Sequence, residues 1–219
     1  MLNLYLIRHG QTYYNRYNKL QGWSNAPLTD QGRADAVSVG KRLADIEFKA
    51  AYSSDTTRAI DTANMLLAQN AYAVPALISD WHFREEFYGS YEGSNMDKAW
   101  LDAGAPVGLT TYAEIVDQYG VDKTKDLLKA ADPWHDAEDS TAYWQRVDAG
   151  FAMILANPAL QDGDNVLVIS HGNTLISLAE RYGAGKIQIH ERPANGSVTQ
   201  IALTTDSLHI IKYNDQVVE

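Results

Sequence analysis

The chain has 219 residues, with 28 acidic and 18 basic side chains, a formal net charge of −10 and no cysteine. The missing thiols exclude disulfide frameworks, cysteine zinc sites and cysteine nucleophiles, and the acidic total argues against a nucleic-acid partner, which selects a basic surface. No run approaches the roughly 18 consecutive apolar residues of a membrane-spanning helix, and the opening MLNLYLIRHG lacks a signal-peptide pattern, so we expect a cytoplasmic protein without a membrane partner.

The first predicted element is a strand over residues 2–7, which are apolar at nearly every position, as is typical of a strand buried on both faces. A helix follows from the predicted N-cap Thr29, with apolar residues at three- and six-residue spacing as far as Leu43. The next predicted elements are a strand at 49–53, a helix capped by Asp55 or Thr56, and a strand at 76–80.

The second half of the chain opens with a mainly helical stretch and closes with strands. Residues 95–160 are predicted to be helical with breaks at 104–106, 120 and 132–133, and their last helix is capped by Ser140 or Thr141. The remaining predicted elements are a buried strand at 165–169, a helix through 175–179, and a hairpin formed by 196–203 and 208–213.

This alternation of strands and helices indicates an α/β fold. We expect a doubly wound, mainly parallel sheet with helices on both faces and an antiparallel strand at one edge. No linker or internal repeat divides the sequence. We therefore expect a single domain over residues 1–219, with a helical insertion at approximately 95–157 that lies over the active site.

Both predicted buried strands end in a histidine followed by a glycine, at His9 and at His171. In open α/β sheets, ligands bind outside the carboxyl ends of the strands. One histidine at a strand end is more often structural, but two at equivalent ends favour a shared site. Arg8 directly precedes His9, and its planar guanidinium suits a phosphate or a carboxylate.

A second arginine, Arg58, lies just inside a predicted helix, near an N-terminus that itself attracts anions. The helix dipole disfavours a cation there, so the residue has another role. It either binds an anion or forms an ion pair with Asp55 or Asp61.

Five segments with recognisable spacing occur in order along the chain. They are Leu6-Ile7-Arg8-His9-Gly10-Gln11-Thr12 with Asn15, Gln21-Gly22 followed by Pro27-Leu28-Thr29 and Gly32, Tyr52-Ser53-Ser54 through Thr57-Arg58-Ala59, Phe83-Arg84-Glu85 leading to Gly89 and Glu92-Gly93, and Val168-Ile169-Ser170-His171-Gly172. Together they resemble the histidine phosphatase superfamily, which includes the cofactor-dependent phosphoglycerate mutases. The resemblance covers about residues 4–203, and the predicted insertion contributes little to it.

The resemblance implies a role for each matching residue. His9 would be the nucleophile that forms a phosphohistidine, held in the right tautomer by a partner such as a nearby backbone carbonyl. Arg8, Arg58 and His171 would surround the phosphoryl group and neutralise its charge. Further substrate-binding residues would be Asn15, Gln21, Gly22, Gly172 and Asn173.

A carboxylic acid must protonate the leaving group and later accept a proton from water. The resemblance assigns this role to Glu85, which lies four residues before Gly89. Glu86 is the alternative, since an alignment by eye can slip by one position. Otherwise Glu86 is a solvated side chain or the partner of Arg84.

The six histidines show no spacing typical of a metal site, so we expect no metal and no cofactor. His82 could line the site, whereas His135, His190 and His209 are expected at the surface or in packing. The small-molecule partner expected is a phosphorylated metabolite, and the sequence leaves the oligomeric state open.

The activity expected is phosphomonoester hydrolysis. Mutases of the family follow the acidic loop with a glycine-rich, basic stretch ending in Asn-Lys, whereas this chain continues from Phe87 to Asn95 as FYGSYEGSN. Residues 94–145 contain four lysines against ten acidic residues, which disfavours a bisphosphate. The alternatives are a cofactor-dependent phosphoglycerate mutase, or a catalytically weak protein that binds a phosphorylated ligand and regulates another.

Overall fold

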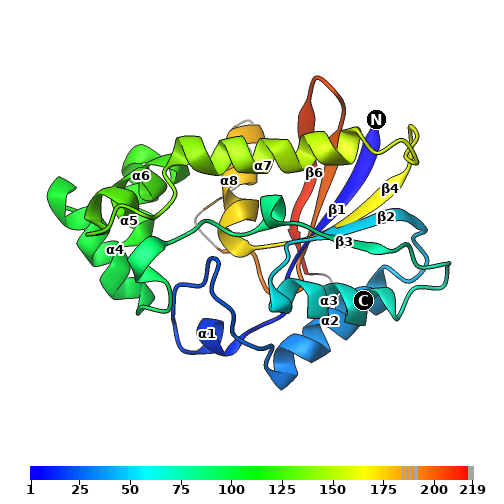
Figure 1. Ribbon diagram of the computed structural model, residues 1–219, viewed down its shortest axis with the longest axis horizontal. Helices are drawn as coiled ribbons and strands as arrows, with labels where there is room; N and C mark the ends of the chain where they lie inside the picture. Colours follow the sequence, from blue (N-terminus) through cyan, green and yellow to red (C-terminus); the bar gives the residue numbers. More distant parts are fainter. Residues whose placement is uncertain (184, 186, 188, 190–191, 217–219) are drawn as a thin grey trace.

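A mixed sheet of six strands forms the centre of the protein in the computed structural model, which describes residues 1–183, 185, 187, 189 and 192–216. The strands lie in the order β3-β2-β4-β1-β5-β6 (Figure 1). Neighbours from β3 to β1 are parallel, and β5 and β6 join antiparallel at one edge. The predicted α/β fold is confirmed. The strands are β1 (Leu2–Arg8), β2 (Phe48–Ser53), β3 (Leu77–Ser79), β4 (Asn165–Ser170), β5 (Val198–Leu203) and β6 (Leu208–Asp215).

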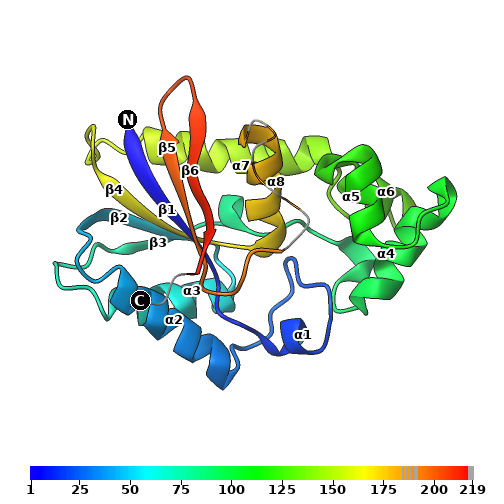
Figure 2. The ribbon, with the colours of Figure 1, turned by 180° about the vertical axis from the view of Figure 1, so that it is seen from behind.

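Helices cover both faces of this sheet (Figures 1 and 2). One apolar cluster joins α2 (Asp30–Arg42) and α3 (Thr57–Leu67) to one face, and another joins α7 (Ser140–Leu155) and α8 (Gly172–Tyr182) to the other face. The two faces are separate because side chains alternate along the central strand: Leu4 and Leu6 contribute to the α7/α8 cluster, whereas Ile7 contributes to the α2/α3 cluster.

The chain encodes most of the helix starts locally. Thr29 caps α2 as predicted, because its hydroxyl accepts the N–H of Gly32 at 3.0 Å. Thr56 occupies the N-cap position of α3. The predicted caps of α7 are wrong: the cap is Asp139, whose carboxylate accepts the N–H of Ala142 at 2.8 Å.

Three helices stand to one side of the sheet, next to α8 (Figure 2): α4 (Met96–Gly104), α5 (Tyr112–Tyr119) and α6 (Val121–Ala131). They share an apolar cluster of their own around Trp100, Ile115 and Leu128. The predicted insertion at 95–157 is therefore too long at its C-terminal end, because α7 buries Tyr143 and Phe151 against the sheet. Four short helices complete the described elements: α1 (Tyr13–Arg16), η1 (Trp81–Phe83), η2 (Gly89–Tyr91) and η3 (Ala105–Val107).

The register of the two central strands places the candidate residues together. β1 and β4 are parallel neighbours, and Arg8 lies opposite Ser170. The residues that follow each strand, His9 and His171, therefore leave the sheet at the same edge. Within the described part of the chain, none of the helices has the length and apolar character needed to cross a membrane.

Candidate active site

His9 and His171 lie side by side at the carboxyl ends of β1 and β4, with ring centroids 5.2 Å apart. Their exposed fractions are 3% and 0%. The His9 N–H donates to the carbonyl of Ser170 at 3.1 Å, which continues the ladder past the end of the strand. The structure thus brings together the two histidines that the strand-end pattern singled out.

A backbone carbonyl fixes the tautomer of His9. Its Nδ1 lies 2.8 Å from the carbonyl oxygen of Gly10. Because a carbonyl can only accept, Nδ1 carries the proton and Nε2 keeps a free lone pair. Burial, followed by the nearby charges of Arg58 and Arg8, holds the pKa of His9 well below its ordinary value. The imidazole is therefore neutral and nucleophilic at Nε2.

His171 is held in the opposite tautomer. Arg58 Nη2 donates to its Nδ1 at 3.0 Å, so Nδ1 must accept and Nε2 carries the proton. This Nε2–H donates to Ser54 Oγ at 2.9 Å. Burial and then the charge of Arg58 hold the pKa of His171 well below its ordinary value. His171 is therefore uncharged, and its Nε2–H is used by Ser54.

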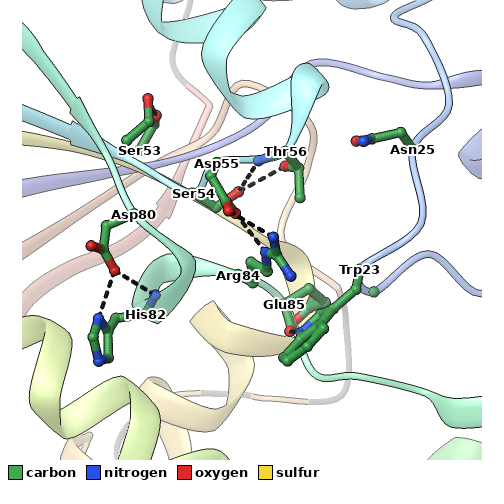
Figure 3. A network of polar contacts seen from close by, with 12 residues as sticks. Trp23, Asn25, Ser53, Ser54, Asp55, Thr56, Asp80, His82, Arg84 and Glu85 are labelled. Atoms are coloured by element: carbon green, nitrogen blue, oxygen red, sulfur yellow. Dashed lines mark hydrogen bonds and ion pairs between the residues drawn. The ribbon is translucent and has the colours of Figure 1, made fainter.

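Arg58 is fully buried and donates to the carbonyl oxygens of Gly22 at 2.7 Å and Ser24 at 2.9 Å. The predicted alternative of an ion pair with Asp55 is wrong, because Asp55 binds Arg84 through contacts of 2.5 and 2.6 Å (Figure 3). Burial lowers the pKa of Arg58 to about 10, so it remains a cation at neutral pH. Its Nε is buried without a hydrogen-bond partner.

Arg8 is held by the segment that precedes β5. Its Nη1 donates to the carbonyl oxygen of Pro193, and its Nε is buried without a partner. A Cβ added to Gly172 would lie 3.1 Å from this Nε, so the missing side chain lets the first residue of α8 approach the guanidinium closely. Burial first, and repulsion by Arg192 second, lower the pKa of Arg8 to about 10.

The other predicted substrate-binding residues differ in the donors they can offer. Gln21 accepts from the Thr12 hydroxyl at 2.6 Å through Oε1, and its Nε2 is buried without a partner. Asn15 accepts the Thr12 N–H at 3.0 Å through Oδ1. The N–H of Gly22 instead donates to Glu92 at 3.1 Å, so Gly22 contributes its carbonyl oxygen to Arg58 rather than a donor to a ligand.

Glu85 is anchored at the N-terminus of α8. Its Oε2 accepts the N–H of Asn173 at 2.7 Å. Its Oε1 accepts the N–H of Thr174 at 3.0 Å, the Thr174 hydroxyl at 2.9 Å and the N–H of Glu86 at 3.1 Å. Glu85 therefore takes the place of a capping side chain, which His171 does not supply. Oε2 thus accepts one hydrogen bond, whereas Oε1 accepts three.

Glu86 is neither solvated nor paired with Arg84, so both predicted alternatives for this side chain are wrong. It is fully buried, and its Oε2 accepts Asn173 Nδ2 at 2.5 Å. Burial raises the pKa of Glu86 to about 8. The charge of Lys125 opposes this rise, and the charge of Glu85 adds to it. Asn173 thus donates its backbone N–H to Glu85 and its side-chain NH₂ to Glu86. Direct contact of Asn173 with a substrate stays a prediction.

Two residues that the sequence analysis did not single out organise the site. The Glu92 carboxylate accepts the N–H groups of Trp23 at 2.8 Å and Ser24 at 3.1 Å, in addition to that of Gly22. Asn195 Nδ2 donates to the carbonyl oxygen of His9 at 2.8 Å. Glu92 lies within one of the quoted motifs, which was the available signal, whereas Asn195 precedes the hairpin without any pattern to mark it.

The remaining histidines lie elsewhere. His82 Nδ1 contacts Asp80 at 2.6 Å, in a pair separate from the site (Figure 3). His135 and His209 are exposed, as expected, and His190 lies outside the described residues. Among the residues that the structure describes, no group of three histidine, aspartate or glutamate side chains is arranged to hold a metal ion.

Comparison with known proteins gives consistent matches over nearly the whole chain. The sequence matches the histidine phosphatase superfamily (branch 1) over residues 4–216. It is 30% identical over 191 residues to a 2,3-bisphosphoglycerate-dependent phosphoglycerate mutase of Neisseria meningitidis serogroup C, covering 82% of this chain and 84% of the relative.

Two solved structures extend this similarity to the fold. A phosphoglycerate mutase from Bacillus anthracis superposes with a TM-score of 0.89 at 34% identity, covering 98% of this chain and 93% of that one. Bacillus stearothermophilus YhfR superposes with a TM-score of 0.72 at 26% identity, covering 99% and 98%.

Proposed function

Because this chain belongs to branch 1 of the histidine phosphatase superfamily, we propose that it hydrolyses phosphomonoesters of a small metabolite through a phosphohistidine at His9. One observation carries the proposal. Three buried nitrogen donors without partners lie on Arg8, Gln21 and Arg58. Arg8 and Arg58 lower the pKa of His9, and the backbone carbonyl of Gln21 accepts from Arg58 at 3.4 Å. Buried donors are rarely left unpaired, and a phosphoryl group would supply acceptor oxygens for all three.

The first chemical step follows from the tautomer of His9. Nε2 attacks phosphorus in line with the ester oxygen, the P–O bond breaks, and its electron pair stays on the leaving oxygen. Arg8 and Arg58 neutralise charge on the equatorial oxygens. His171 holds the Arg58 guanidinium through its Nδ1. Glu85 gives a proton to the leaving oxygen, which departs as an alcohol.

The second step regenerates the enzyme. A water molecule attacks phosphorus, the P–Nε2 bond breaks, and its electrons return to His9. Glu85, now a carboxylate, takes the proton from the attacking water, so that inorganic phosphate leaves and Glu85 is ready for another turnover. The residues on their own account for both proton transfers, and we propose that no metal or cofactor takes part.

The second candidate is a bisphosphate-dependent phosphoglycerate mutase. It is favoured by the similarity of this chain to two phosphoglycerate mutases, at 30% and 34% identity. The charge of the α4–α6 region weighs against it for this chain. Residues 94–145 hold ten acidic residues against four lysines, and one of these, Lys125, is fully buried with Nζ on the Ser177 hydroxyl. A regulatory protein that only binds a phosphorylated ligand would need neither a nucleophile nor an acid, so the presence of His9 and Glu85 weighs against that third alternative.

Hydrolysis of p-nitrophenyl phosphate near pH 6, with and without EDTA, tests the proposal. We expect turnover that EDTA does not change and that His9→Ala abolishes. Conversion of 3-phosphoglycerate to 2-phosphoglycerate that depends on bisphosphoglycerate, without hydrolysis of any ester, would instead establish the mutase. Turnover that survives in His9→Ala would refute the phosphohistidine. The predictions of a cytoplasmic location and of no nucleic-acid partner stay predictions.

The identity of the acid is tested separately by Glu85→Gln, with Glu86→Gln as the matched neighbour. If Glu85 protonates the leaving oxygen, Glu85→Gln should slow an alkyl phosphate at least tenfold more than p-nitrophenyl phosphate, whose phenolate leaves without a proton. Glu86→Gln should slow the two esters equally. The reverse pattern would assign the acid to Glu86.

A further inference from the structure

A cavity of about 300 Å³ lies between α4, α5 and α8, apart from the residues that surround His9. The residues that line it include Met96, Trp100, Tyr112, Ile176 and Arg192. Asp97 also lines it, and its carboxylate accepts Asn18 Nδ2 at 2.8 Å. Trp100 and Tyr112 form a tilted aromatic pair with centroids 4.9 Å apart. The volume is at the lower end of the range for small-molecule sites, which are mostly apolar with a few polar groups.

Tyr112 connects the cavity to the phosphoryl site. Its ring forms part of the cavity wall, and its hydroxyl donates to Asn173 Oδ1 at 2.8 Å. Asn173 in turn donates to Glu85 and Glu86. Ile176, on another wall, lies one helical turn beyond Gly172, the first residue of α8. The cavity is therefore adjacent to the place where the leaving oxygen would be protonated.

Arg192 is the cation of this cavity. Its guanidinium lies 5.4 Å from the centroid of the Tyr112 ring. Its charge is also close enough to Arg8 to lower the pKa of that residue, second only to burial. Arg192 thus lies near both the aromatic wall and the phosphate-binding arginine. An arginine at this junction provides a planar donor fork for a carboxylate.

We propose that this cavity holds the leaving-group part of the substrate, and that the substrate is a phosphomonoester of an aromatic or apolar alcohol that carries a carboxylate bound by Arg192. This inference rests on the proposed phosphatase function. The aromatic and aliphatic walls would bury the body of the alcohol. The acidic side chains of the α4–α6 region would disfavour a second phosphate, whereas one carboxylate needs only one arginine.

The test compares phenyl phosphate, 4-(hydroxymethyl)phenyl phosphate, and 3- and 4-carboxyphenyl phosphate as substrates. The hydroxymethyl ester is the neutral control of similar size. We expect kcat/KM for at least one carboxyphenyl ester to exceed that for the neutral control about tenfold or more, the effect of a charge-assisted hydrogen bond. Arg192→Ala should reduce this ratio to about one, and Arg192→Lys should restore part of it.

Arg181→Ala is the matched control. Arg181 lies near the C-terminal end of α8, is exposed and bound to Asp148, and is not among the residues that line the cavity. It should keep the wild-type ratio. Equal kcat/KM for charged and neutral esters in the wild type, or a ratio that survives in Arg192→Ala, would overturn the inference.

Failure of the proposed function is distinguishable from failure of the cavity. If the protein hydrolyses none of these esters, the phosphatase proposal fails. The cavity is then decided by calorimetric binding of the same esters to His9→Ala. Tighter binding of a carboxyphenyl ester that is lost in His9→Ala/Arg192→Ala would support the carboxylate site, and equal binding of all the esters would refute it.

Discussion

Glu92 and Arg58 both form hydrogen bonds with the backbone of the short loop 22–24. The N–H groups of Gly22, Trp23 and Ser24 donate to Glu92, whereas the carbonyl oxygens of Gly22 and Ser24 accept from Arg58. The loop therefore uses its donors on one charged side chain and its acceptors on the other. The position of the Arg58 guanidinium depends on this arrangement, although Glu92 itself touches neither histidine.

We predict that Glu92→Gln weakens phosphate binding. The new NH₂ group would face backbone N–H donors, which leaves part-buried donors unpaired at a cost of about 1–3 kcal/mol. The inhibition constant for inorganic phosphate should rise roughly tenfold, and the melting temperature should fall by about 2–12 °C for a chain of this size. Both are measured on the same preparation, by steady-state inhibition and by a thermal melt.

Asp132→Asn is the matched control for this variant. Asp132 is a buried carboxylate that, like the partly buried Glu92, holds a loop, since it accepts three backbone N–H groups and the Ser90 hydroxyl. It should lower the melting temperature to a similar extent while leaving the phosphate inhibition constant unchanged. If both variants shift the inhibition constant equally, Glu92 has only a general structural role.

The N-terminus of α8 links Glu85 to His171. His171 occupies the N-cap position but contributes no side-chain hydrogen bond there, because its ring binds Arg58 and Ser54. The first N–H groups of α8 donate instead to Glu85, which comes from a distant loop. One helix start thus fixes the spacing between His171 and Glu85, the residue proposed as the proton donor.

The same elements show how far sequence reasoning reaches. Strands such as β1 and β4 are predictable because burial on both faces leaves a continuous apolar run, and their His-Gly ends mark the edge where His9 and His171 meet. The packing of α7 against the sheet was not predictable, since an amphipathic pattern does not say which apolar surface a helix covers. The predicted boundary of the insertion was wrong for this reason.

Contacts between loops are the other part that the sequence does not reveal. Three such contacts join segments far apart in the chain. They are the burial of Glu86, the hydrogen bond from Asn195 to the His9 carbonyl, and the hydrogen bond from the Gly22 N–H to Glu92. No local spacing encodes them. Individual roles at the site follow from motifs, whereas the division of donors and acceptors among them requires the fold.

For the whole molecule, the net charge of −10 conceals a cationic centre. Arg8 and Arg58 are buried beside His9 and His171, and both contribute to holding the pKa of His171 low, whereas Arg146 is paired with Glu138 at 2.7 Å. A local potential of this kind attracts anions regardless of the total charge. The composition therefore weighs against nucleic acid and leaves a small anionic substrate open.

The buried Glu86 should also give the stability of the whole molecule a distinctive pH dependence. Its folded pKa of about 8 lies above the ordinary value of 4.5. Between these two values the folded protein keeps a proton that the unfolded chain has released, so the free energy of unfolding falls as the pH rises. Above pH 8 both states are ionised, and the folded state carries the full cost of a buried carboxylate.

We predict that Glu86→Gln removes this slope. Near pH 4.5 the melting temperatures of wild type and variant should be similar, and at pH 9 the variant should melt at least about 3 °C higher. Glu47→Gln, which removes an exposed carboxylate paired with Lys49, serves as the control and should show no such divergence. The buried neutral histidines His9 and His171 also make stability fall at pH values below their ordinary pKa of 6.5. This effect is the same in wild type and variants, so it drops out when the melting temperature of one is subtracted from that of the other. Parallel curves for wild type and Glu86→Gln from pH 5 to 9 would show that Glu86 is ionised in the folded protein throughout, with its charge compensated by Lys125.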